Sequence, residues 1–220
     1  LKKFNRLDDL IASCKDENGN SIFNIFSLQD EVALGKQTRD LIESNPQEYP
    51  LLDSNRYRSA YTYLNEIRND ILSTGQVGYR DQFEWKLYII NRDDVVNAFC
   101  TPGGYIYVYT GLIKYLDDKS SLAGVIGHEM AHADKRHSTE QLTKKYGVET
   151  LLQVVLGNNA NLISQIGSEL IGLSFSRSDE TEADEYSVRY LCTSKYHADG
   201  AANFFIKIEN QGGGNIPAFL

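Results

Sequence analysis

This chain of 220 residues has few cysteines, fewer basic than acidic residues, and few long apolar runs. Its three cysteines, Cys14, Cys100 and Cys192, are too few for a disulfide framework. We expect Cys100 and Cys192, which lie in apolar contexts, to be small buried thiols. The formal net charge of -8 argues against nucleic acid or an anionic membrane surface as a partner.

Residues 150–168 carry no charge and therefore raise the question of a membrane span. Amide side chains interrupt this stretch at Gln153, Asn158, Asn159, Asn161 and Gln165. A membrane span needs about 20 predominantly apolar residues. We therefore predict two ordinary helices that meet near Gly157, and no transmembrane span.

Apolar periodicity predicts an α+β fold, mostly helical with a small β-sheet. A first helix should begin at Ser27, which can cap it, and a second should run over about 53–73. Strands are expected at 84–90, 95–100 and 105–109. Later helices are expected from about 120 to beyond His137, then around Glu180 with an end at about Ser194, and over about 199–209.

The most informative stretch is Gly127-His128-Glu129-Met130-Ala131-His132, an H-E-x-x-H motif. On a helix, positions i and i+4 share a face, so His128 and His132 can present two imidazoles to one metal ion. Zinc binds imidazole nitrogen readily, and a catalytic zinc keeps one of four positions for water. Glu129 would face that water and could take its proton. A surface helix with two solvated histidines is the alternative, and the apolar flanks of the motif count against it.

A catalytic zinc site needs a third protein ligand, and the sequence offers one downstream. Glu180 and Asp184 are four residues apart, so on a helix Glu180 could bind the metal while Asp184 accepts a hydrogen bond from a liganding histidine. Glu182 is expected to face elsewhere. An acidic, solvated helix start is the alternative. His137 lies five residues after His132 and, on a continuous helix, would point about 140° away from the ligand face, so we exclude it as a ligand.

Together these motifs resemble metallopeptidase family forty-eight, the gluzincins that include the CAAX prenyl proteases, HtpX, the mitochondrial Oma proteases and BepA. The matching segments are Asn97-Ala98-Phe99, Pro102 to Val108, Thr110-Gly111-Leu112, His128 to His132 with His137, and Ser176-Arg177 with Glu180 to Asp184. The resemblance covers roughly residues 28–220 and implies a zincin-like (minigluzincin) α+β domain. It implies one zinc ion per chain, bound by His128, His132 and Glu180. It also implies Glu129 as the catalytic base and Asp184 as the hydrogen-bond acceptor of a liganding histidine.

The resemblance also implies a polypeptide substrate, whose backbone would bind an edge strand near Asn97 and Ala98. An edge strand offers unpaired amides and carbonyls to an incoming chain; an ordinary inner strand is the alternative. The implied function is a zinc-dependent metalloendopeptidase in envelope protein quality control. The alternative function is a zinc-binding, chaperone-like outer-membrane assembly factor with little proteolysis.

We expect a leader or linker at 1–26, followed by a single metallopeptidase domain at 27–220. Ile-Ala-Ser-Cys14 is similar to a lipobox, in which the cysteine becomes the lipid-modified first residue. Asp8 and Asp9, however, interrupt the run of about 7–15 apolar residues that a secretory signal needs. Two predictions stay open: a lipid anchor at Cys14, with a location in the periplasm or outer membrane, or an amphipathic leader with an incidental cysteine.

Overall fold

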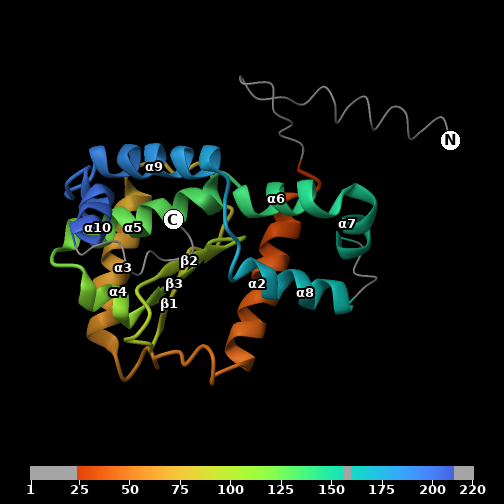
Figure 1. Ribbon diagram of the computed structural model, residues 1–220, viewed down its shortest axis with the longest axis horizontal. Helices are drawn as coiled ribbons and strands as arrows, with labels where there is room; N and C mark the ends of the chain where they lie inside the picture. The colour runs from red at the N-terminus through yellow and green to blue at the C-terminus, as the bar shows by residue number, and fades with distance from the viewer. Residues whose placement is uncertain (1–23, 156–159, 211–220) are drawn as a thin grey trace.

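The computed structural model describes residues 24–155 and 160–210 of the chain (Figure 1). Cys14, Gly157 and most of the leader predicted at 1–26 lie outside the described residues. The α+β prediction is confirmed, because helices surround one three-stranded sheet. The elements are α2 (Leu28–Ser44), α3 (Arg58–Ser73), β1 (Lys86–Ile90), β2 (Ala98–Thr101), β3 (Tyr105–Tyr109), α4 (Thr110–Tyr115), α5 (Lys119–Asp134), α6 (His137–Tyr146), α7 (Val148–Val155), α8 (Ala160–Leu170), α9 (Arg177–Cys192) and α10 (Gly200–Asn210).

The sheet has the strand order β1-β3-β2, with β1 parallel and β2 antiparallel to β3. A tight turn at Pro102–Gly104 joins β2 to β3, and Gly103 and Gly104 supply the positive φ angles of 76° and 83° that this turn requires. Within residues 24–155 and 160–210, β2 therefore lies at an edge of the sheet, and the alternative of an inner strand near Asn97 and Ala98 is wrong. The opposite edge is β1.

Helix α5 is the buried centre of the fold. It contacts α3, α9, α10 and the sheet, and each of its residues from Ser121 to Asp134 is buried. Gly124 allows α10 to approach, because a Cβ atom there would stand 2.0 Å from the backbone nitrogen of Ala201. Ser187 of α9 donates a hydrogen bond to the Gly124 carbonyl at 2.8 Å. The apolar flanks of the H-E-x-x-H motif thus become a helix that is enclosed on every side.

The prediction that this helix continues beyond His137 is wrong. It ends at Asp134, Arg136 takes a left-handed conformation with φ 64°, and His137 begins α6. A contact with distant sequence holds the break: Arg136 Nε donates to Glu31 Oε1 of α2 at 2.6 Å, and Arg136 Nη2 donates to the Phe26 carbonyl. Nothing in the local pattern marks such a turn, because neither glycine nor proline stands there.

Helices α2, α6, α7 and α8 gather at the end of the molecule that lies on the right in Figure 1. Their apolar residues form a separate cluster that includes Leu34, Leu142, Leu151 and Ile166. The predicted pair of helices around 150–168 is therefore present as α7 and α8. Among the described residues, each helix is too short or too polar to cross a membrane.

Three smaller predictions differ from the structure. The second helix begins at Arg58 rather than near 53, because Asp53 Oδ1 accepts hydrogen bonds from Asn55 N and Arg56 N and holds a turn there. Strand β2 begins at Ala98 rather than at 95. Cys100 is buried as expected, but Cys192 is exposed, at the last residue of α9.

Candidate metal centre

Two helices supply the candidate metal ligands, and a cap positions the start of each. Asp118 accepts a hydrogen bond from Ser121 N at 2.9 Å and begins α5, which carries the H-E-x-x-H motif. Ser176 and Asp179 form a capping box that begins α9, which puts Glu180 in its first turn. The acidic stretch of the sequence is therefore a helix start, as its alternative interpretation expected, and it also faces α5.

The three candidate ligand atoms converge on one point. His128 Nε2 and His132 Nε2 lie 3.0 Å apart. Glu180 Oε2 lies 3.3 Å from His128 Nε2 and 3.7 Å from His132 Nε2. Ligands about 2.0–2.1 Å from a tetrahedral zinc ion stand about 3.3 Å from one another. The spacing and the two-imidazole, one-carboxylate donor set therefore fit a zinc ion.

The two carboxylates of this cluster, Glu180 and Asp184, favour a positive charge between them. Burial opposes the charged form of His128, but the Asp184 and Glu180 carboxylates outweigh it and raise the pKa of His128 to about 10. Burial also opposes the charged form of Glu180, but hydrogen bonds from His128 and His132 lower its pKa to about 2. Burial lowers the pKa of His132 to about 4. A cation between these ligands would supply the charge that the His128 proton otherwise provides.

Glu129 lies beside the ligands, and only 3% of it is exposed. Its Oε1 atom is buried and has no hydrogen-bond partner within the described part of the chain. Burial raises the pKa of Glu129 to about 8, although a hydrogen bond from the Cys100 backbone N–H opposes this rise. A buried carboxyl beside the ligands, with an unused oxygen and a raised pKa, is suited to taking and returning a proton.

Each histidine also has a partner on its far ring nitrogen. His128 Nδ1 lies 2.9 Å from Asp184 Oδ1. His132 Nδ1 lies 2.9 Å from His137 Nδ1, and His137 Nε2 lies 3.2 Å from Glu182 Oε2. If His132 binds a metal through Nε2, its Nδ1–H donates to His137, whose Nε2–H then donates to Glu182. Both rings are therefore oriented by a carboxylate of α9.

Sequence reasoning missed the part of Glu182 and the contact between His132 and His137. The first error follows from the position of Glu182, two residues from Glu180 on the same helix; the second follows from the assumption of a continuous helix, which would turn His137 away from the site. A signal for Glu182 was present, since it lies on α9 between Glu180 and Asp184. Sequence reasoning also gave no role to Phe175, whose ring stacks on His132 with centroids 4.0 Å apart.

A pocket joins Glu129 to the edge strand of the sheet. It is lined on one side by Asn97, Phe99 and Cys100, and on the other by Leu170, Ile171, Gly172, Leu173 and Phe175, from the end of α8 and the segment before α9. Asn97, predicted to bind substrate, is thus at the site. Ala98 follows it in β2 with its side chain fully buried, and its backbone N–H donates to Asn97 Oδ1 at 2.8 Å.

The chain is similar to proteins of known name. A model of the family described as "Peptidase family M48" matches residues 60–220. The mitochondrial metalloendopeptidase OMA1 of Arabidopsis thaliana is 31% identical over 155 residues, which are 70% of this chain and 32% of that protein. The beta-barrel assembly-enhancing protease of Yersinia pestis is 27% identical over 208 residues, 88% of this chain and 40% of that protein.

A third relative matches over most of its own length. The metalloprotease LoiP of Escherichia coli (strain K12) is 28% identical over 225 residues, which are 90% of this chain and 81% of that protein. The chain thus spans less than half of the first two relatives and most of the third.

Proposed function

Because the chain belongs to peptidase family M48, whose model matches residues 60–220, we propose that it is a zinc-dependent metalloendopeptidase. The observation that carries the proposal is the convergence of His128 Nε2, His132 Nε2 and Glu180 Oε2 beside the buried Glu129 carboxyl. We assign the first three residues as the ligands of one zinc ion per chain and Glu129 as the general base.

The zinc ion would lower the pKa of a water molecule and polarise the carbonyl of the scissile peptide bond. Glu129 would take the proton of that water as its oxygen attacks the carbonyl carbon, and then deliver the proton to the leaving nitrogen. Asp184 would hold the ring of His128, and His137 with Glu182 the ring of His132, so that both Nε2 atoms keep their lone pairs towards the metal.

The substrate in this proposal is a polypeptide in an extended conformation. The outer edge of β2, near Asn97 and Ala98, would pair with its backbone, because an edge strand offers unpaired groups to an added strand. The pocket that joins Asn97 to Glu129 supports this path. The buried Glu129, with one oxygen unpaired within the described part of the chain, favours catalysis over the alternative of a zinc-binding assembly factor with little proteolysis.

The cellular role is a further part of the proposal. The name of one bacterial relative, a beta-barrel assembly-enhancing protease, supports a role in protein quality control in the cell envelope. A lipid anchor at Cys14 would hold the chain at the periplasmic or outer membrane surface. Incorporation of labelled fatty acid by the wild-type chain, and its loss in Cys14→Ala, is the expected result; no incorporation in the wild type rejects the anchor.

Replacement of the general base tests the proposed reaction. Glu129→Gln keeps the shape of the side chain and the metal ligands but removes the proton acceptor. We expect this variant to retain zinc and to cleave an unfolded protein such as casein at least about 100-fold more slowly. Cleavage at the wild-type rate, with zinc bound, would reject the role of Glu129.

A further inference from the structure

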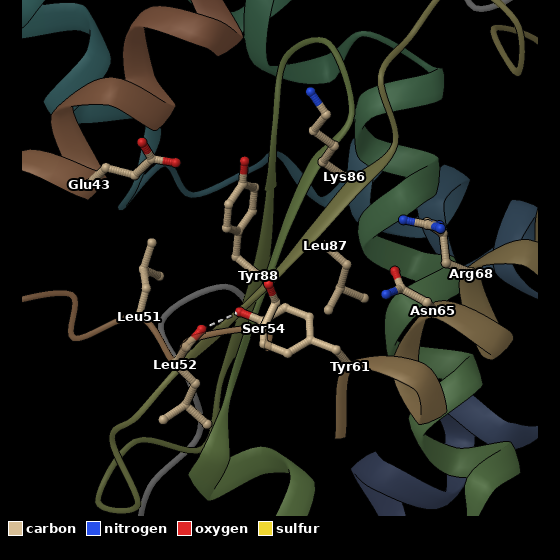
Figure 2. Close-up of a pocket in the computed structure, with 10 residues that line it drawn as sticks. All are labelled: Glu43, Leu51, Leu52, Ser54, Tyr61, Asn65, Arg68, Lys86, Leu87 and Tyr88. Atoms are coloured by element: carbon tan, nitrogen blue, oxygen red, sulfur yellow. Dashed lines mark hydrogen bonds between the residues drawn. The ribbon is translucent and has the colours of Figure 1, made fainter. Parts of the chain in front are cut away.

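A second pocket, of about 420 Å³, lies at the β1 edge of the sheet, opposite the β2 edge (Figure 2). Figure 2 shows it between β1, helix α3 and the segment that carries Leu51 and Leu52. Its lining residues are Glu43, Leu51, Leu52, Ser54, Tyr61, Asn65, Arg68, Lys86, Leu87 and Tyr88. Two strand spacings, roughly 10 Å, separate the two edges of the sheet.

The β1 edge is open at one residue inside this pocket. The backbone groups of Ile89 point away from β3. Its N–H donates to Tyr61 Oη at 3.3 Å, and its carbonyl accepts from Leu52 N at 2.9 Å. The backbone direction alternates along a strand, so Leu87 presents its N–H and carbonyl to the same side. Neither group has a hydrogen-bond partner among the residues that the structure describes. Two residues before Leu87 in the chain, the Trp85 carbonyl accepts a hydrogen bond from Arg68 Nη1 at 2.8 Å.

Arg68 brings a positive charge to the pocket without an acidic partner. Its guanidinium bonds the Trp85 carbonyl and the side chain of Asn69, and no carboxylate within residues 24–155 and 160–210 forms an ion pair with it. The side chain is partly buried, and burial lowers its pKa. Among the lining residues, Glu43 carries a carboxylate, which lies 3.8 Å from Arg39. In a chain of net charge -8, an arginine left without a carboxylate is available to a ligand.

Other polar groups in the pocket are also available. The side-chain amide of Asn65 and the hydroxyls of Ser54 and Tyr88 have no hydrogen-bond partner in the described part of the chain. Figure 2 shows Asn65 beside Arg68 on α3, with Leu87 between them and Tyr88. Leu51, Leu52 and Leu87 supply apolar surface. The pocket therefore combines a cation, an amide, one open strand position and an apolar wall.

We propose that this pocket binds the C-terminal end of a polypeptide, with its free carboxylate on Arg68 and Asn65. Arg68 and Asn65 donate to the carboxylate, Leu87 pairs with the backbone of the last residues, and the leucines contact a terminal apolar side chain. A chain end fits better than a through-running strand, because the edge is occupied at Trp85 and Ile89 and only Leu87 is open. The identification of this chain end with that of a substrate rests on the proposed function; the binding site itself does not.

Binding of a labelled peptide tests this proposal without any cleavage. The probe is a fluorescein-labelled hexapeptide of threonine and valine that ends in leucine, with a free C-terminal carboxylate or with an amide. Fluorescence anisotropy with the full Glu129→Gln chain gives its affinity. We expect the free acid to bind at least tenfold more tightly than the amide, and its affinity to fall as salt rises.

Three variants locate the site. Arg68→Ala should remove the tenfold preference for the free acid. Ser54→Trp, at an exposed position, should fill the pocket and weaken the binding of the free acid to a similar extent, without disturbing Arg68. Arg58→Ala, on the same helix but outside the pocket, is the matched control for charge and should leave binding unchanged.

Equal affinity for acid and amide, or equal losses in Arg68→Ala and Arg58→Ala, would overturn the proposal. An amidated peptide with an internal glutamate that binds as tightly as the free acid would also overturn it, in favour of a side-chain carboxylate. An absence of hydrolysis by the wild-type chain rejects the proposed function but leaves this result intact.

Discussion

His132 and His137 face one another through their Nδ1 atoms, which are 2.9 Å apart, although a continuous helix would turn them to different sides. The left-handed residue Arg136 breaks the helix between them and returns His137 towards the site. His137 then connects His132 to Glu182 on α9. His132, a candidate ligand, is thus oriented by a break after its own helix and by a carboxylate of the helix α9.

We predict that Glu182→Gln weakens zinc binding by about tenfold, because the glutamine no longer holds His137 and His132 through a charged acceptor. Titration of the metal-free chain with zinc against a competing chelator measures the affinity. Glu185→Gln is the matched control on the same helix, since Glu185 forms an exposed ion pair with Arg189. Equal zinc affinity in the two variants contradicts the role of Glu182.

Asp184→Asn should weaken zinc binding by about 10–100-fold, because Asp184 orients His128 and stabilises its liganding form. The asparagine can still accept a hydrogen bond, so the fold should remain intact. Circular dichroism and the same zinc titration measure the two effects. If zinc affinity is retained in Asp184→Asn, the contact between His128 and Asp184 has no part in metal binding.

The existence of most helices, and the helix faces that the candidate ligands share, could be predicted from the sequence because these signals are local. A spacing of four residues puts His128 with His132, and Glu180 with Asp184, on shared faces in any regular helix. Strand β3 is predicted at its observed bounds because its alternating run begins directly after a turn that contains two glycines.

The errors come from contacts between distant segments. The end of α5 depends on Arg136 reaching Glu31, 105 positions earlier in the chain. The exposure of Cys192 depends on what packs against the end of α9, which its apolar neighbours in sequence do not reveal. The pocket at β1 is formed by four segments, which are α2, the segment 51–54, α3 and β1, and no motif marks it.

The stability of the break after α5 can be tested at Glu31. This residue is 1% exposed and binds Arg136, Thr139 and Asn24. Glu31→Ala would leave Arg136 without its acidic partner, and we expect a loss of about 3 kcal/mol in the free energy of unfolding. Urea unfolding measures it. Glu43→Ala, at an exposed ion pair, should cost less than about 1 kcal/mol; similar losses at both positions would contradict the account.

The close contact of α5 with α10 gives another prediction. Gly124→Ala would bring a methyl group to 2.0 Å from Ala201 N, so the helices must separate. We expect a loss of about 1–3 kcal/mol in the free energy of unfolding. Gly172→Ala is the control, because a Cβ there meets nothing within 4 Å. A fully stable Gly124→Ala chain would show that α10 does not pack against α5 in this way.

The most direct measurement is the zinc content of the purified chain, determined by elemental analysis beside that of Glu180→Gln. We predict about one zinc per wild-type chain and far less in Glu180→Gln, whose amide is a poorer ligand than a carboxylate. Glu185→Gln, which changes the same residue type five residues further along α9, should keep the wild-type content. Equal zinc in Glu180→Gln and in the wild type, or none in the wild type after purification in zinc-containing buffer, would contradict the three-ligand centre.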